Sequence, residues 1–369
     1  MLDFHRADLA RLAARDRLRG LAPQRGKDFA SNDYLGLANS LRLAAAIADA
    51  VAEGVPVGSG GSRLLRGNHP EHEALEAEAA TFFGAEASLY FSSGYTANAT
   101  LLATLPQRGD LIVHDALVHA SMHEGMKLSR AQSVAAAHND PAAFEGAIRT
   151  WRAQGGKGTV WIAVESLYSM DGDTAPLAEL TAVAERHDAM LIIDEAHATG
   201  VFGDRGQGLA TPGERVITLH TCGKAMGCEG ALVTGPRIVR DYLVNRGRGF
   251  IFSTAPSPLM ARGVREGLRI LADEPERRSA LQDRITLAGE RLAPHGALAN
   301  GTPIMPLILH DNGRTMRAAE ALQARGFDIR GIRPPTVPVG AARLRLSITL
   351  NVEEADIRAL AEALQEVLV

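Results

Sequence analysis

The chain has 369 residues, of which 46% are apolar and 22% are charged, so it is long enough for a large core and for two domains. Its 39 basic and 43 acidic residues give a net charge of −4, which argues against a nucleic-acid partner. It contains no run of about 18 apolar residues, so we expect no membrane span. The two cysteines, Cys222 and Cys228, make no disulfide framework and favour a reducing cytoplasm.

The arginine-rich N-terminal segment predicts an amphipathic helix over residues 4–19. A mitochondrial presequence has a similar pattern but avoids acidic residues, and this segment contains Asp3, Asp8 and Asp16. We therefore expect a helix of the mature protein. Two further helices should follow, one over residues 41–53 and one that ends at Phe83.

From residue 87 onward, strands and helices alternate. The expected strands cover residues 88–91, 111–114, 159–164, 190–193 and 216–219, with one more that ends near residue 138. This alternation predicts right-handed crossovers and a mainly parallel sheet. Beyond Gly235 come long helices and then a mixture of strands and helices. We expect an N-terminal arm (1–45), a large α/β domain (46–250) and a smaller C-terminal α+β domain (251–369).

The segment 190–230 carries the residues with the most distinctive chemistry. One apolar run ends at Asp194, His197 follows, and a second run leads to Thr221 and Lys224. Ligands in open α/β sheets bind beyond the carboxyl ends of the strands, so these four side chains should meet at one edge. An acid, a histidine, a hydroxyl and a lysine suit pyridoxal phosphate (PLP). The lysine would form a Schiff base, and the acid would keep the ring nitrogen protonated.

Two glycine-containing segments resemble nucleotide loops but fail the tests for them. Residues 58–62 follow a predicted helix, and Arg63 stands where a Rossmann loop has its third glycine. Lys224 is followed by Ala225, which excludes a Walker A loop. The turn at Gly94 and Tyr95 opens a helix after a strand, so it is either a phosphate site or an ordinary turn.

Two other pairs of residues have more than one interpretation. His119 and His123 are four residues apart, which would place them on one face of a helix, but no HExxH motif or third ligand accompanies them, so we predict no metal site. Arg343 and Arg345 share one face of a predicted strand. They are either charges on an edge strand or, for one of them, a fork for a carboxylate.

Taken together, these segments resemble the α-oxoamine synthase family of fold-type I PLP enzymes. The markers are the segment 31–37 (SNDYLGL), residues 138–140 (HND), 169–173 (SMDGD) and 194–200 (DEAHATG), the Lys224 loop, and residues 343–346 (RLRL). The resemblance implies a mainly parallel seven-stranded central sheet with a smaller C-terminal α+β domain. It also implies homodimers whose active sites lie at the subunit interface.

The resemblance assigns roles to individual residues. Lys224 would carry the cofactor, Asp194 would pair with its ring nitrogen, and His119 would stack on the ring. The other implied cofactor contacts are His197 and Ser169 beside the ring oxygen, Gly94, Tyr95 and Thr221 at the phosphate, and Ser253 or Thr254 at the phosphate from the second subunit. The implied substrate positions are Arg19 (or Arg17 after a small shift), Ser62, His119, Arg333, Thr336 and Arg345, with Arg345 on the amino-acid carboxylate.

Within that family, residues 58–63 and 67–69 are most similar to the biotin-pathway members. Those enzymes condense L-alanine with pimeloyl-CoA or a pimeloyl-acyl carrier protein and release carbon dioxide. The siblings glycine C-acetyltransferase and 5-aminolevulinate synthase use glycine and stay alternatives. The latter has threonine where Ser62 stands, and a difference of one methyl group shifts substrate choice by about 1–3 kcal/mol, which favours alanine here. A non-catalytic partner subunit is disfavoured because Lys224 is present. In the Lys224 loop, Cys228 and Glu229 stand where the family leads us to expect small or apolar residues. Glu229 either weakens the binding of the phosphate or the acyl thioester, or it faces solvent.

Overall fold

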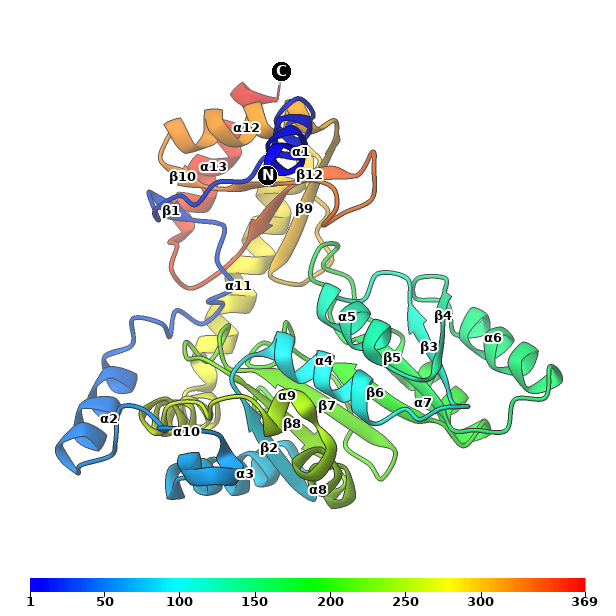
Figure 1. Cartoon of the computed structure of the whole chain (residues 1–369). Coiled ribbons are helices and arrows are strands. Elements are labelled where there is room, and N and C mark those ends of the chain that lie inside the picture. Colours follow the sequence, from blue (N-terminus) through cyan, green and yellow to red (C-terminus); the bar gives the residue numbers. More distant parts are fainter. Residues whose placement is uncertain (369) are drawn as a thin grey trace. The chain divides into compact units, whose positions relative to one another are not determined.

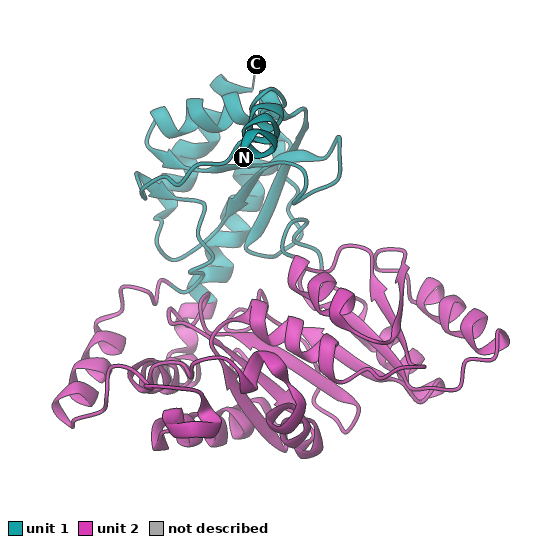
Figure 2. Ribbon diagram, in the orientation of Figure 1, with its two compact units in different colours: residues 1–35, 169–173, 279–369 teal, residues 36–168, 174–278 magenta. Residues whose placement is uncertain are grey.

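The computed structural model describes residues 1–368 (Figure 1). The chain forms two compact units, shown in different colours in Figure 2. Unit 1 comprises residues 1–35, 169–173 and 279 onward, and unit 2 comprises residues 36–168 and 174–278. The predicted division at residues 45 and 250 stays a prediction. No helix in the described part of the chain is long and apolar enough to cross a bilayer.

Unit 2 is built on a sheet of seven strands in the order β2-β8-β7-β6-β5-β3-β4. The strands are β2 (Ala87–Phe91), β3 (Leu111–Asp115), β4 (Gln132–Ala136), β5 (Val160–Glu165), β6 (Met190–Asp194), β7 (Val216–Thr221) and β8 (Ala231–Gly235). Only β8 runs antiparallel to its neighbours, β2 and β7. The predicted mainly parallel seven-stranded sheet is therefore confirmed.

Helices pack on both faces of this sheet, as expected for crossover connections. The helices of unit 2 are α2 (Leu41–Ala52), α3 (Pro70–Phe83), α4 (Gly94–Thr104), α5 (Ala120–Leu128), α6 (Pro141–Ala153), α7 (Leu177–Arg186), α8 (Arg237–Arg246), α9 (Arg248–Ile251) and α10 (Pro258–Asp273), with a π-helical turn at Arg63–Gly67. One core packs α4 and α5 on the sheet through Leu101 and Met122. A second core packs α6 and α7 on it through Phe144 and Leu180.

The start of α6 illustrates how the sequence sets these boundaries. Asp140 caps the helix, because its side chain accepts hydrogen bonds from the backbone N–H groups of Ala142 and Ala143 at 3.0 and 3.2 Å. Pro141 follows at the first helical position, where its missing N–H costs nothing.

Unit 1 contains a three-stranded antiparallel sheet in the order β11-β12-β9. Its elements are α1 (Asp3–Ala13), β1 (Lys27–Asp28), β9 (Ile304–His310), α12 (Asn312–Ala324), β10 (Phe327–Asp328), β11 (Arg330–Ile332), β12 (Ala342–Ser347) and α13 (Glu354–Val367), with a 3-10 turn at Ala293–His295. α11 (Pro275–Leu292) begins in unit 2 and ends in unit 1. Strand β12 lies in the middle of the sheet, and Arg343 and Arg345 on it are buried. The edge-strand interpretation of these two arginines is therefore wrong.

The N-terminal helix is shorter than predicted. α1 ends at Ala13, whereas the sequence pattern extends to residue 19. Asp16 adopts a left-handed backbone conformation (φ 52°), and the backbone N–H of Arg17 donates back to the Leu12 carbonyl at 2.8 Å. This is the geometry of a Schellman-type helix end, which short polar residues tolerate better than bulky ones.

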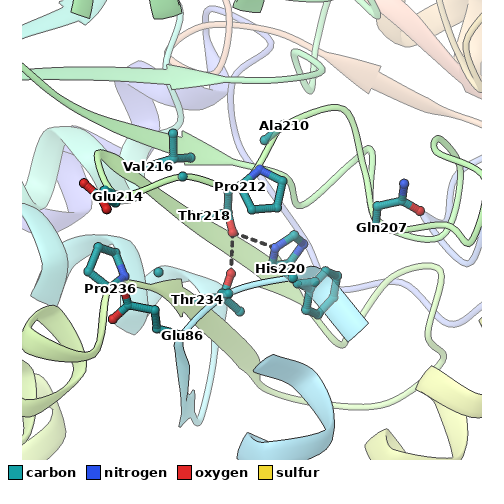
Figure 3. A pocket seen from close by; sticks show the side chains of 15 residues that line it. Glu86, Gln207, Ala210, Pro212, Glu214, Val216, Thr218, His220, Thr234 and Pro236 are labelled. Atoms are coloured by element: carbon teal, nitrogen blue, oxygen red, sulfur yellow. Dashed lines mark hydrogen bonds between the residues drawn. The ribbon is translucent and has the colours of Figure 1, made fainter. Parts of the chain in front are cut away.

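A cavity of about 230 Å³ lies on one face of β7, walled by the loop around Pro212 and by Glu86 and Glu214 (Figure 3). Side chains alternate along the strand, so Thr218 and His220 face this cavity while Leu219 and Thr221 face the opposite side.

A chain of hydrogen bonds, here called the His220 chain, runs beside the first cavity. The Thr199 hydroxyl donates to the Glu195 carbonyl, so it accepts from His220 Nδ1 at 2.9 Å. His220 Nε2 then accepts from Thr218 at 2.8 Å, and Thr218 accepts from Thr234 at 2.6 Å. Phe83 stacks on the imidazole with 3.6 Å between ring centroids. Burial lowers the pKa of His220 to about 3, so the ring is neutral.

Candidate active site

A cavity of about 210 Å³ lies at the carboxyl edge of the unit 2 sheet. It is lined by Gly94, Tyr95, Asn98, His119, Ser121, Glu165, Asp194, Ala196, His197, Leu219, Thr221 and Lys224. Strands β5, β6 and β7 end at this edge and contribute Glu165, Asp194 and Thr221. Seven of the residues that the sequence analysis assigned to the cofactor are in this set, and together they form one pocket.

Lys224 lies in the loop between β7 and β8. Its Nζ is 2.8 Å from Nε2 of His197, so the two side chains share a hydrogen bond inside the cavity. The loop is held by a hydrogen bond from the Gly227 N–H to the Lys224 carbonyl and by one from the Cys228 N–H to the Cys222 carbonyl. Glu229 is exposed, which matches the solvent-facing alternative.

Asp194 ends β6, and its carboxylate is held in one orientation. Oδ1 accepts from the backbone N–H of Ala196 at 2.8 Å, and Oδ2 accepts from Nδ2 of Asn98 at 2.6 Å. Only 4% of the residue is exposed. A fixed, buried carboxylate of this kind can stabilise a positive charge on a ligand without first reorganising.

The adjacent Glu195 has a different environment and a different task. It is fully buried and accepts from the Ser166 hydroxyl and from the backbone N–H groups of Leu209 and Ala210. Burial raises the pKa of Glu195 to about 7, and the Asp194 charge adds to the shift, although the three hydrogen bonds oppose it. Glu195 thus ties the loop that follows β6 to the sheet and does not line the cavity.

His119 lies just before α5 and caps it, which corrects the expectation that His119 and His123 share a helix face. The His119 ring accepts through Nδ1 from the Ser121 N–H and contacts the Ser121 hydroxyl at 2.8 Å. Burial lowers the pKa of His119; the Asp194 charge opposes this shift and the Lys224 charge adds to it. His123 instead packs against His114, with 5.2 Å between ring centroids.

The N-terminus of α4 forms one wall of the cavity. Ser93 caps the helix by accepting from the Thr96 N–H at 3.1 Å. A Cβ atom on Gly94 would lie 3.7 Å from the Thr221 hydroxyl oxygen, so the first turn of α4 and Thr221 are close neighbours. A helix N-terminus beside a hydroxyl is a favourable environment for a phosphate.

The residues present fit PLP. The cavity offers a lysine amine, a fixed carboxylate, a neutral histidine and an anion-binding helix end. In addition, Asn98 Oδ1 is buried and has no hydrogen-bond partner within the described residues. Lys224, Asp194, His119 and the first turn of α4 would hold the aldehyde, ring nitrogen, ring face and phosphate, respectively.

Ser62, Ser253 and Thr254 lie elsewhere. They line a separate cavity of about 370 Å³ together with Leu64, Leu65, Ile251 and Phe252. None of them lines the Lys224 cavity. Their predicted roles in cofactor and substrate binding therefore stay predictions.

The other predicted site residues belong to unit 1. The Arg345 guanidinium donates to the Ser169 carbonyl at 2.6 Å, to the Ser347 hydroxyl at 2.7 Å and to the Asn32 side chain at 2.9 Å. It therefore joins Ser169 to the core of unit 1. Its predicted role toward the substrate carboxylate stays a prediction.

Arg19, Thr336 and Arg333 form a second group in unit 1. Arg19 donates to the Thr336 hydroxyl at 2.8 Å, and Arg333 donates to the Leu18 and Gly331 carbonyls. Burial lowers the pKa of Arg333, and the Arg19 charge lowers it further. Two cations held this close favour an anion between or beside them.

Sequence reasoning missed three polar residues of the Lys224 cavity, namely Asn98, Ser121 and Glu165, and the apolar Ala196 and Leu219. The spacing of Gly94 and Asn98 was a usable signal, because residues four apart share a helix face. Glu165 was recognisable as the last residue of a buried strand. Ser121 carried no signal, since its position depends on where α5 begins.

Comparisons with known proteins agree with this geometry. The chain matches the family described as aminotransferase class I and II over residues 26–364. It is 43% identical over 339 residues to an 8-amino-7-oxononanoate synthase of Chromobacterium violaceum, covering 90% of this chain and 86% of that protein. The chain is also 40% identical over 384 residues to the 8-amino-7-oxononanoate synthase of Aromatoleum aromaticum. That match covers 99% of this chain and 98% of that protein.

Solved structures give the same picture. A serine palmitoyltransferase from S. paucimobilis with bound PLP–myriocin aldimine matches with a TM-score of 0.90 at 25% identity, covering 99% of this chain and 97% of that one. An 8-amino-7-oxononanoate synthase from Francisella tularensis matches with a TM-score of 0.77 at 26% identity, covering 93% and 98% of the two chains.

Proposed function

The chain belongs to the class I and II aminotransferase family, together with the 8-amino-7-oxononanoate synthases, and we propose that it condenses L-alanine with a pimeloyl thioester. The products would be 8-amino-7-oxononanoate, carbon dioxide and the free thiol of coenzyme A or acyl carrier protein. The protein is a PLP-dependent enzyme. The observation that carries the proposal is the contact of 2.8 Å between Lys224 Nζ and His197 Nε2 in the cavity that Asp194 and His119 also line.

The residues of the cavity have separable tasks. When bound, PLP supplies an aldehyde that condenses with amines and a ring that withdraws electrons from the substrate. Lys224 Nζ would anchor it and would be the base available for the alanine Cα proton. His197 Nε2 shares a proton with Nζ at 2.8 Å and so can assist that transfer. Asp194 would keep the ring nitrogen protonated, because a nearby anion favours the charged form.

Four residues are our candidates for binding the charged ends of the substrates. Arg345 is our candidate for the alanine carboxylate, since a guanidinium can bind a carboxylate through two parallel hydrogen bonds. Arg19, Arg333 and Thr336 are candidates for an anionic group of the acyl donor. Burial and the Arg19 charge both lower the pKa of Arg333, and a bound anion would oppose this shift, which supports the assignment.

The enzyme also works, in this proposal, as a cytoplasmic homodimer in which Ser253 or Thr254 reaches the phosphate of the other subunit. The cavity that these residues line is surrounded by exposed apolar side chains, with Leu65 85% and Phe252 71% exposed. Exposed apolar groups gathered at one place commonly mark a contact surface. Both cysteines are free thiols, which supports a reducing compartment.

The function is tested by incubating the PLP-loaded protein with L-alanine or glycine and with pimeloyl-CoA, pimeloyl-acyl carrier protein or acetyl-CoA. Mass spectrometry should detect 8-amino-7-oxononanoate with alanine and a pimeloyl donor, and Lys224→Ala should form none. Faster turnover of glycine than of alanine would show that the protein has the activity of a glycine-using sibling enzyme instead. Comparing the rates with pimeloyl-CoA and with pimeloyl-acyl carrier protein shows which of the two is the acyl donor.

The shared site is tested by mixing two inactive variants, Lys224→Ala and Ser253→Ala/Thr254→Ala, under conditions that exchange subunits. If the phosphate contact comes from the second subunit, hybrid dimers contain one intact site and recover activity. A mixture that stays as inactive as its components would contradict the shared site. Sedimentation of the wild-type protein at several concentrations gives the oligomeric state independently.

A further inference from the structure

Asn98 connects two side chains that line the cavity, Asp194 directly and His119 through Ser121. It lies on α4 and is 2% exposed. Its Nδ2 is 2.6 Å from Asp194 Oδ2 and 3.1 Å from the Ser121 hydroxyl oxygen. A carboxylate only accepts hydrogen bonds, so the amide nitrogen must face Asp194, and both of its protons are then used. The orientation of Asn98 is therefore set by its neighbours.

The same connections determine where the proton of His119 lies. Since the Ser121 oxygen accepts from Asn98, its own proton is available for His119 Nδ1, which is 2.8 Å away. The backbone N–H of Ser121 points at the same nitrogen at 3.3 Å. A ring nitrogen approached by two donors carries no proton, and a neutral imidazole has one nitrogen of each kind. The proton of His119 is thus on Nε2.

We propose that Asn98 and Ser121 are positioning residues that join the Asp194 carboxylate to the His119 ring and hold His119 as the neutral imidazole protonated on Nε2. The inference rests on the proposed function only in taking the Lys224 cavity as the cofactor site. It adds two points to that function. Asn98 fixes the orientation of the Asp194 carboxylate, and through Ser121 it makes His119 a hydrogen-bond donor at Nε2. The lowered pKa of His119, caused by burial, is consistent with the neutral ring.

The tautomer is tested directly by ¹⁵N NMR of the PLP-loaded protein labelled in its histidine rings, with the His119 signals assigned from their loss in His119→Gln. The wild-type protein should show an unprotonated Nδ1 and a protonated Nε2. Ser121→Ala and Asn98→Ala should move the two nitrogen shifts toward each other, because the second tautomer becomes populated, and Ser121→Thr should restore the wild-type pattern. A protonated Nδ1 in the wild type, or unchanged shifts in both alanine variants, would overturn the proposal.

PLP affinity gives a second readout. Asn98→Ala should weaken PLP binding by about 10- to 100-fold, the range expected when a hydrogen bond to a charged group is lost. Thr100→Val, which changes another buried polar residue of α4 outside this network, is the matched control and should bind PLP as the wild type does. Equal affinities for Asn98→Ala and the wild type would contradict a positioning role. Neither readout uses alanine or a thioester, so a wrong substrate assignment leaves both results intact.

Discussion

Replacing His220 with glutamine should flatten the acid dependence of stability. His220 is fully buried, and burial lowers its pKa from 6.5 to about 3. Because the unfolded chain binds a proton that the folded chain does not, stability is fully present above pH 6.5 and is lost as the pH falls toward 3. For these two values, linkage predicts that His220 alone removes about 2 kcal/mol of stability between pH 7 and pH 5.

Urea unfolding followed by intrinsic fluorescence at pH 7, 6 and 5 measures this difference. His220→Gln cannot titrate, so its free energy of unfolding should fall by about 2 kcal/mol less than that of the wild type over the same interval. His72, whose pKa burial lowers to about 4, titrates in both proteins and cancels in the comparison.

Thr234→Val is the matched control for the His220 chain. It removes the last hydroxyl of the chain but leaves His220 able to titrate. It should lower stability by about 1 kcal/mol at every pH and keep the wild-type slope. If His220→Gln and the wild type showed the same slope, His220 would not be held neutral by the fold, and the description of its surroundings would be wrong.

Three other substitutions test the site and its support. Glu195→Gln should destabilise the protein by about 1–3 kcal/mol in urea unfolding. The described partners of the carboxylate all donate hydrogen bonds to it, so the NH₂ group of glutamine would face another donor. Unchanged stability would contradict this. Asp194→Asn should weaken PLP binding, measured by equilibrium dialysis, by about 10- to 100-fold, since the charge opposite the ring nitrogen is lost; wild-type affinity would exclude that pairing. Ser62→Thr should lower the ratio of kcat/KM for alanine to that for glycine by about tenfold, and an unchanged ratio would remove Ser62 from substrate selection.

Much of the fold followed from local patterns. Buried apolar runs that end in polar residues, such as the run before Asp194, predicted parallel strands and the edge at which the site forms, and the structure has both. The family resemblance and the PLP assignment are confirmed by the matches to known proteins. The strands and the edge were predictable because continuous apolar runs and the direction of the strands can be read from short segments.

The features that sequence reasoning missed depend on single backbone conformations or on tertiary contacts. The end of α1 depends on the left-handed conformation of Asp16, which helix periodicity does not reveal. The burial of Arg343 and Arg345 depends on β9 and β11 pairing on either side of β12. The link from Asp194 through Asn98 to Ser121 joins three elements that are far apart in the sequence.

The central claim is that the enzyme joins alanine to an acyl group while releasing the alanine carboxylate as carbon dioxide. The most direct measurement supplies L-alanine labelled with ¹³C at C1, together with the pimeloyl donor, and follows the label. We predict labelled carbon dioxide in a one-to-one ratio with an unlabelled amino ketone, and neither product with Lys224→Ala. Label retained in the acylated product, or amino ketone formed without labelled carbon dioxide, would contradict the account.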